Sequence, residues 1–310
     1  TQAEAVAAAI VDVAGRAKKP ILSCFMGTHG VPESLRSLHT GHVPSFRFPE
    51  GAARALSLVS SYARWRQAPP ARLLEAGPTP AAASQALGAA RRRLGPPGGW
   101  LSAEEAEAFC RAWGLTLPAA RLVAPTAAAV EDAAAALGYP VVLKAQREGL
   151  LHKSHEGGVA VGLAGPVALR EAAARMAALA PEAFLVQKQI VGGEEWLAGV
   201  IRDRDYGPLV TAGAGGTRTE IWHDVEQRLA PLTQVDLDAL LDRPRFARTL
   251  AGTAGGKPGD RAALAAFVRQ LSFAALAHPE VEEMEANPLL VLPAGEGAVA
   301  VDVRLRIGAR

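Results

Sequence analysis

This sequence has few of the features that mark secreted proteins, membrane-spanning proteins or proteins stabilised by a structural metal ion. Its 310 residues include only two cysteines, Cys24 and Cys110, which lie far apart and show no metal-ligand spacing. Free thiols in a reducing compartment are therefore expected. No run reaches the roughly 18 apolar residues that a membrane span needs, and no secretion signal is recognisable. Because the first residue is Thr1 rather than methionine, we expect an internal or trimmed piece of a cytoplasmic protein.

An excess of charge of either sign is also lacking. Lysine and arginine number 33 against 31 acidic residues, a net charge of +2. This balance argues against a nucleic-acid-binding protein that works by bulk positive charge. Hydrophobic residues make up 49% of the chain, enough for a soluble core, and the length suggests about two domains. The sequence sets no oligomeric state and leaves a homo-oligomer open.

The first 68 residues alternate between helical and extended patterns. Val6, Ile10 and Val13 recur near helical spacing in an alanine-rich stretch. The expected elements are a helix at 3–17, strands at 21–26 and 43–48, and a helix from 49 to about 66. Such alternation is typical of a parallel α/β sheet. Since a stable sheet usually has more strands, residues 1–68 are interpreted as the tail of a larger domain. Residues 69–99, rich in proline and glycine, indicate a linker.

A stretch from Gly138 to Leu163 carries the strongest chemical signal. A short buried strand ends at Lys144, and a lysine held there is a point charge suited to a phosphate. A loop with His152, Lys153, Ser154 and a glycine pair follows, and then a second strand. Successive loop amides can form an anion-binding nest. An ordinary hairpin with a solvated basic loop explains the spacing equally well.

Three oxygen-bearing side chains near the C-terminus predict a metal site. Glu285 and Asn287 are two residues apart on an extended segment, so they face the same way. Asp302 begins the next strand, and pairing of the two strands would bring these oxygens together. Carboxylate and amide oxygens, completed by nucleotide phosphates, are the ligands that Mg²⁺ prefers.

These stretches resemble the ATP-grasp domain of the NDP-forming acyl-CoA synthetases, the group that includes ADP-forming acetate–CoA ligase. The strand G-Y-P-V-V-L-K leads to the loop H-K-S-x-x-G-G-V, and V-Q-x-x-I-x-G-G-x-E, G-x-G-G-x-x-x-E and R-L-A-P-L follow. The last motif, E-M-E-A-N-P-L with a later V-x-D, matches the family's metal site. Near the N-terminus, K-P-I-L-S-C-F-M-G resembles the end of a flavodoxin-like CoA-ligase lobe. The resemblance implies an α/β chain with that lobe's remnant at 1–70, a linker at 71–98 and an ATP-grasp domain at 99–310.

The resemblance also implies a reaction and a set of site residues. ATP, a carboxylic acid and CoA would give ADP, phosphate and acyl-CoA, with the phosphoryl group relayed on histidine. CoA and the acid would bind through lobes upstream of Thr1, so the fragment alone is expected to be incomplete. His152 would accept the phosphoryl group, and Lys144 would hold nucleotide phosphates. The other expected nucleotide contacts are Lys153, Ser154, Gln187, Lys188, Gln189, Ile190, Glu195, Gly215, Gly216 and Glu220, and the expected Mg²⁺ ligands are Glu285, Asn287 and Asp302.

Three departures from the family pattern leave a second function open. His155 replaces an acidic residue, Arg218 replaces an apolar or aromatic one, and Ala254 stands where an arginine is common. The same architecture serves as a regulatory ATP- or acyl-CoA-sensing module in protein lysine acetyltransferases. Retention of Lys144 and His152 favours catalysis. A ligase that joins acids directly to amines would need no such histidine loop.

Overall fold

The computed structural model describes residues 3–27, 30–32, 35, 43–147, 156–216, 223–252 and 257–309. Two compact units are separated in the chain, Thr1–Ala71 and Arg72–Arg310. Each unit has its own hydrophobic core, and each is described by itself.

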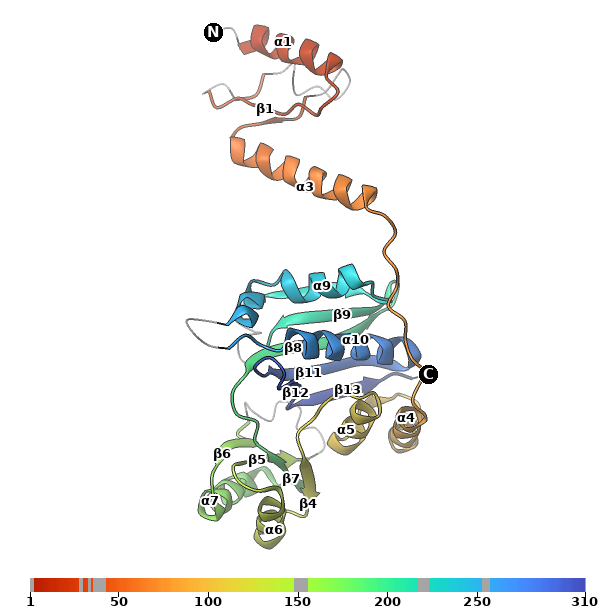
Figure 1. Cartoon of the computed structure of the whole chain (residues 1–310), viewed down its shortest axis with the longest axis vertical. Coiled ribbons are helices and arrows are strands. Elements are labelled where there is room, and N and C mark those ends of the chain that lie inside the picture. The colour runs from red at the N-terminus through yellow and green to blue at the C-terminus, as the bar shows by residue number, and fades with distance from the viewer. Residues whose placement is uncertain are drawn as a thin grey trace. The chain divides into compact units, whose positions relative to one another are not determined.

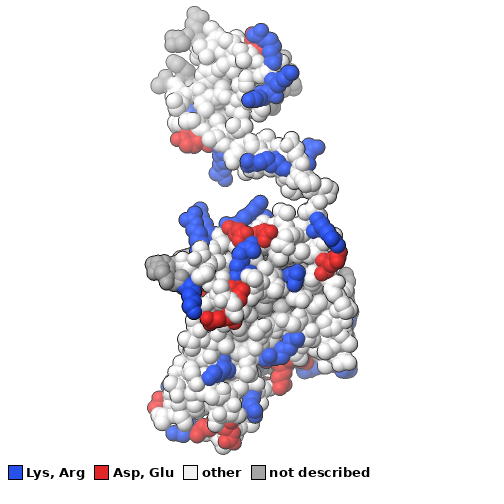
Figure 2. Space-filling view, viewed as in Figure 1, with Lys and Arg blue, Asp and Glu red and all other residues white. Residues whose placement is uncertain are grey.

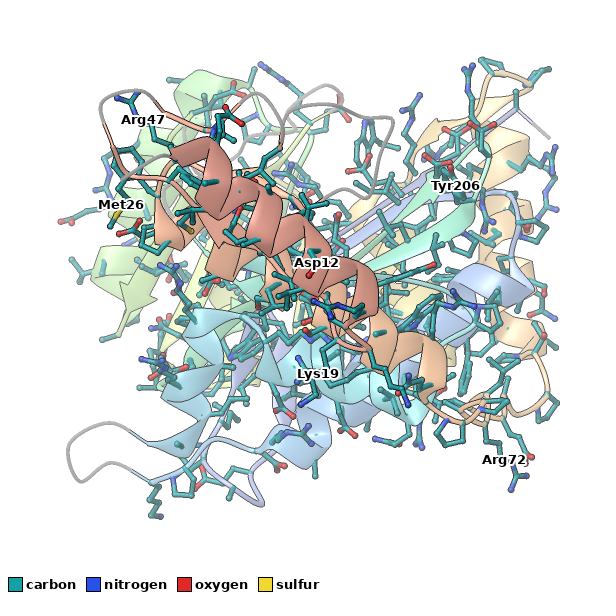
Figure 3. The ribbon with its side chains drawn as sticks, turned by 90° about the horizontal axis from the view of Figure 1, so that it is seen from above. Asp12, Lys19, Met26, Arg47, Arg72 and Tyr206 are labelled. Carbon is teal, nitrogen blue, oxygen red and sulfur yellow. The ribbon has the colours of Figure 1, made fainter. Side chains whose placement is uncertain are left out.

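The first unit is a small α/β arrangement. Its described elements are α1 (Ala3–Arg16), β1 (Ser23–Cys24), β2 (Ser45–Phe46) and α3 (Pro49–Gln67). The two strands pair in parallel, as the alternation of helix and strand predicted. Its core contains Ala7, Leu35 and Val43. Arg16 bonds Asp12 on the outer surface of α1, where Figure 3 labels the aspartate. No residue of α3 is buried.

The second unit is built on a large antiparallel sheet. Its strand order is β10-β9-β8-β11-β13-β3, and β12 pairs with β11. Helices α9 and α10 pack against these strands (Figure 1), while α5 packs beside β13 and α4 beside α5. One continuous core joins the sheet to these helices and includes Trp196, Leu240 and Leu271. The element bounds are β3 Gly99–Trp100, β8 Glu194–Asp203, β9 Gly207–Ala214, β10 Val225–Leu229, β11 Val281–Val291, β12 Ala298–Ala300, β13 Val303–Ile307, α4 Ala81–Leu94, α5 Ala103–Ala112, α9 Gln234–Asp242, the 3-10 helix η2 Arg245–Ala251 and α10 Arg261–Ala277.

A smaller antiparallel sheet completes the second unit, with the strand order β4-β7-β5-β6. One of its faces packs against α6 and α7 (Figure 1). Alternation along β5 explains this, because Val141, Leu143 and Ala145 enter that core while Lys144 lies on the opposite face. The bounds are β4 Ala120–Val123, α6 Ala127–Leu137, β5 Val141–Gln146, β6 Val159–Leu163, α7 Pro166–Met176, the 3-10 helix η1 Ala177–Leu179 and β7 Ala183–Lys188.

Local sequence signals set several element ends as expected. The Ser102 hydroxyl accepts from the Glu105 amide, and the Glu105 carboxylate accepts from the Ser102 amide, so this serine and the glutamate three residues later form a capping box. The segment 71–98, expected as a linker, contains α4, which buries Ala83, Leu87 and Ala90 in the large core. The compact second unit therefore begins before residue 99.

The two cysteines are free thiols, as expected. Cys24 is exposed and Cys110 is buried in the large core. Burial raises the pKa of Cys110 to about 12, so this thiol stays protonated and unreactive at neutral pH.

The surface shown in Figure 2 mixes basic and acidic side chains over both units, in line with the balanced composition. In the described part of the chain, no helix combines the length and apolar character that crossing a membrane requires. Tyr206 is 72% exposed at the turn between β8 and β9 (Figure 3). The Asp203 carboxylate accepts from the Asp205 and Tyr206 amides and so fixes this turn.

Candidate active site

Lys144 joins the two sheets of the second unit. It lies on β5 of the small sheet and is only 6% exposed. Its ammonium donates to the Val301 carbonyl at 2.5 Å and lies 3.7 Å from Asp302 Oδ1. Both partners belong to the segment between β12 and β13 of the large sheet. A buried cation is thereby held beside one of the predicted metal ligands, with its remaining hydrogens available to another acceptor.

The three predicted metal ligands come together in the folded chain. β11 and β13 pair in antiparallel register, with Glu285 opposite Arg304. The Asn287 amide donates to the Asp302 carbonyl at 3.1 Å, and the Asn287 side-chain nitrogen donates to Glu285 Oε1 at 3.0 Å. Asn287 Oδ1 accepts from the Gly216 amide at 2.7 Å. This last bond fixes which end of the Asn287 side chain is the oxygen.

Glycines at the end of β9 and just after it allow a close approach of three backbone segments. A Cβ on Gly213 would lie 2.3 Å from the Asp224 carbonyl, and one on Gly215 would lie 2.2 Å from the Trp196 carbonyl. The Gly215 amide donates to the Glu195 carbonyl at 2.8 Å. Gly216 has φ +61° beside the Glu195 carboxylate. Gly215 and Gly216 therefore lie against Glu195, and the Gly216 amide also bonds Asn287. Only glycine fits at these close approaches.

Asp224, the acidic residue that follows the glycine-rich motif, forms hydrogen bonds with backbone amides of the same unit. Its two carboxylate oxygens accept from the backbone amides of Arg245 and Phe246, at 3.0 and 2.6 Å. These amides begin η2, so Asp224 caps this helix rather than pointing a free carboxylate at a ligand.

The expected nucleotide contacts Gln187–Ile190 form a hinge that runs from the end of β7 in the small sheet towards β8 of the large sheet. Gln187 is 3% exposed and shares a cleft with Lys144. The Lys188 ammonium does not reach that cleft as a free charge, because it donates to the Gly138 and Tyr139 carbonyls at 2.8 and 2.9 Å. Gln189 Oε1 accepts from the Gly162 amide on β6 at 2.7 Å. Ile190 follows these anchored residues.

A cleft of 710 Å³ brings Lys144, Gln187 and Asp302 together. The small sheet lines one side, and α5, β3 and β13 contribute the other. Glu195, Gly215, Gly216, Glu285 and Asn287 are not among its lining residues. They form a neighbouring group that is joined to the cleft through Asp302, by the bond between the Asn287 amide and the Asp302 carbonyl.

Two acidic residues of α5 line the same cleft and were missed by the sequence analysis. Glu104 and Glu107 lie in the first turns of this helix. Burial raises the pKa of the Glu107 carboxyl, and the charges of Arg111 and Lys144 partly oppose that shift. The capping box indicates the start of the helix, but only tertiary packing brings the first turns of α5 to the cleft. No local motif could have found these residues.

Several predicted residues lie outside the described part of the chain. His152, Lys153, Ser154 and Glu220 belong to this group, and their predicted roles stay predictions. The departures at His155, Arg218 and Ala254 lie outside it too.

The donor set at Glu285, Asn287 and Asp302 fits a hard divalent cation. It offers two carboxylates and one amide oxygen, and it lies beside a cleft that could admit phosphate oxygens. No cluster of three histidine, cysteine or carboxylate side chains occurs within the described ranges. Mg²⁺ shared with a polyphosphate would suit a set of two carboxylates and one amide oxygen.

Comparison with known proteins identifies the family. Residues 94–307 match the ATP-grasp domain family. The chain is 29% identical over 308 residues to an ADP-forming 4-hydroxybutyrate–CoA ligase of Nitrosopumilus maritimus, a match that covers 97% of this chain and 44% of that protein. It is 32% identical to the β subunit of an ADP-forming acetate–CoA ligase I of Pyrococcus furiosus, over 65% of this chain and 89% of that subunit.

A solved structure agrees with both matches. It is a dinucleotide-forming acetyl-coenzyme A synthetase 1 of Ca. Korarchaeum cryptofilum in complex with coenzyme A and Mg-AMPPCP. The TM-score is 0.63 at 28% identity, and the superposition covers 73% of this chain and 99% of that one. The chain spans less than half the length of the Nitrosopumilus relative. Family, fold and matched residues agree that this chain belongs to the NDP-forming acyl-CoA synthetases of the ADP-forming acetate–CoA ligase type, and that it contains their ATP-grasp domain.

Proposed function

We propose that this chain binds Mg–ATP between its two sheets and forms the phosphoryl-transferring part of an ADP-forming acyl-CoA ligase. The observation that carries the proposal is the meeting of Lys144, from the small sheet, with Asp302, from the large one. A buried ammonium beside an oxygen-rich group at a 710 Å³ cleft is an arrangement suited to a polyphosphate and its counter-cation.

Each described residue has a definite task in this proposal. Lys144 exchanges its contact with the Val301 carbonyl for a phosphate oxygen and supplies a charge-assisted hydrogen bond. Glu285, Asn287 and Asp302 would hold Mg²⁺, which when bound neutralises charge on the phosphate oxygens. Glu195, whose carboxylate lies beside Gly216, would accept from the ribose hydroxyls. The protein thus contributes positioning and charge rather than covalent chemistry at these positions.

The covalent step is assigned to His152. Its neutral imidazole nitrogen would attack the γ-phosphorus, ADP would leave, and the phosphoryl group would remain on the ring. The Korarchaeum relative is described with a phosphohistidine segment pointing towards its nucleotide binding site, which supports a relay of this kind. CoA and a carboxylic acid would bind to lobes that make up the rest of the longer relatives.

The catalytic interpretation is favoured over the regulatory one. The curated relatives reported above are ligases, one of them a separate β subunit. A match over 89% of that β subunit supports a partner subunit or lobe that completes the enzyme.

Asn287→Ala and Asp302→Ala are expected to weaken ATP binding roughly tenfold or more when Mg²⁺ is present, because each removes an oxygen proposed to contact the metal. With EDTA in place of Mg²⁺, the two variants should bind ATP as the unaltered chain does. Isothermal titration calorimetry measures both conditions. Glu282→Ala serves as a matched control, since this exposed acid lies on the same strand. Equal losses with and without Mg²⁺ would mean that the residues act through the fold.

A further inference from the structure

The segment that links the two sheets is tied to the small sheet by side chains that point away from the cleft. Lys188 and Gln189 follow Gln187, the last hinge residue that lines the cleft. The Lys188 ammonium bonds two successive carbonyls, those of Gly138 and Tyr139, just beyond the end of α6. The Gln189 amide oxygen bonds the Gly162 amide of β6. Two consecutive residues therefore fasten the hinge to α6 and to β6.

The backbone of the same two residues is also engaged. The Lys188 amide donates to the Ala119 carbonyl at 2.8 Å, and the Gln189 amide donates to the Pro140 carbonyl at 3.2 Å. Neither N–H is left for a ligand. Ile190 is the first hinge residue whose amide has no hydrogen-bond partner among the residues that the structure describes. A base docking at this hinge would consequently meet the backbone from Ile190 onward, or the Gln189 carbonyl.

The hydrogen bonds of the Lys188 ammonium to the Gly138 and Tyr139 carbonyls are of a strong type. Gly138 ends α6 with φ +76°, and the helix end is a region of partial negative charge. An ammonium that donates to two carbonyls there gains charge-assisted hydrogen bonds. A Cβ on Gly138 would lie 3.8 Å from the ammonium nitrogen, so the lysine sits directly against this glycine. Losing the ammonium would free the hinge from α6 without touching the cleft.

We propose that Lys188 and Gln189 are positioning residues, whose side chains hold the hinge so that the Ile190 backbone presents a fixed edge to the nucleotide base. This inference rests on the proposed ATP binding, and it reassigns both side chains from ligand contact to support of the hinge. The hinge would then be pre-organised, so that little ordering is required when the base docks.

The test compares two ligands that differ in having a base. For Lys188→Met, Mg–ATP affinity is expected to fall about tenfold, whereas affinity for Mg–tripolyphosphate, which has no base, should stay within about twofold of the unaltered chain. Arg170→Met is the matched control, because it removes another cation contact to α6, the pair with Glu131 at 3.1 Å, in which no hinge residue takes part. Both affinities should be unchanged in that control.

Gln189 gives an independent pair of variants. Gln189→Leu removes the acceptor for the Gly162 amide and should weaken Mg–ATP binding severalfold, while Gln189→Glu keeps an acceptor oxygen and should retain most of the affinity. This pair also keeps the inference testable if Lys188→Met does not fold. Unchanged ATP affinity in both Lys188→Met and Gln189→Leu would overturn the hinge assignment alone. Equal losses for both ligands would do so too, whereas absence of ATP binding to the unaltered chain would overturn the proposed function and the hinge assignment with it.

Discussion

His152→Ala is expected to abolish phosphoryl transfer to the chain. After incubation with γ-labelled Mg–ATP, the unaltered chain should carry an acid-labile, base-stable label, which is the behaviour of a phosphohistidine. A neutral imidazole nitrogen carries a lone pair and can act as the nucleophile. The variant should retain no label, while its ATP affinity stays close to that of the unaltered chain, since Lys144 and the metal-site oxygens remain.

The position of the label shows whether His152 or His155 accepts the phosphoryl group. His155→Ala is the matched control, because it removes the neighbouring imidazole that replaces the family's acidic residue. Label that survives in His152→Ala but is lost in His155→Ala would move the acceptor to His155. Absence of label from the unaltered chain at saturating Mg–ATP would mean that another lobe must place the loop.

Lys144→Met is expected to weaken Mg–ATP binding by roughly tenfold to a hundredfold. Hydrogen bonds to charged groups contribute about 1.5–3 kcal/mol, and methionine keeps the apolar stem while removing the charge. Because the ammonium contacts the Val301 carbonyl and Asp302 in the structure, its loss also leaves the Asp302 carboxylate without this cation. Calorimetry measures the affinity for Mg–ATP. The unfolding temperature of the same variant is measured beside it, to separate a loss of binding from a loss of stability.

Arg147→Met is the matched control for Lys144. Arg147 lines the same cleft, but its guanidinium donates to the Leu179 carbonyl at 2.8 Å. Its loss should change ATP affinity by less than about threefold, within the range of a surface charge. If the two variants lose equal affinity, the effect of Lys144 is general electrostatics rather than a specific phosphate contact.

Much of the local structure was predictable because the decisive signals are short-range. The Ser102–Glu105 capping box and the Thr126 cap form as the residue types dictate. Alternate residues of β5 enter the small core, so Lys144 faces away from that core as a strand period of two requires. The juxtaposition of Glu285, Asn287 and Asp302 also follows from strand pairing, since β11 and β13 are antiparallel neighbours.

The remaining features depend on contacts between distant parts of the chain. Nothing near Lys188 in sequence indicates that its ammonium bonds carbonyls some fifty residues earlier. The position of α5 at the cleft, which Glu107 and Lys144 both line, likewise arises from packing of α5 on β13. The helix α4 within the expected linker was hidden by flanking prolines and glycines, although its apolar face joins the large core. Such placements are set by tertiary burial rather than by local propensity.

In the function proposed here, Mg–ATP binds between the two sheets at Lys144 and Asp302. Calorimetric titration of the unaltered chain with ATP, with Mg²⁺ and with EDTA, tests it most directly. Saturable one-site binding that is at least about tenfold tighter with Mg²⁺ is the predicted result, because the metal would join the phosphates to the oxygens of Asp302 and Asn287. No heat of binding at millimolar ATP in the presence of Mg²⁺ would contradict it.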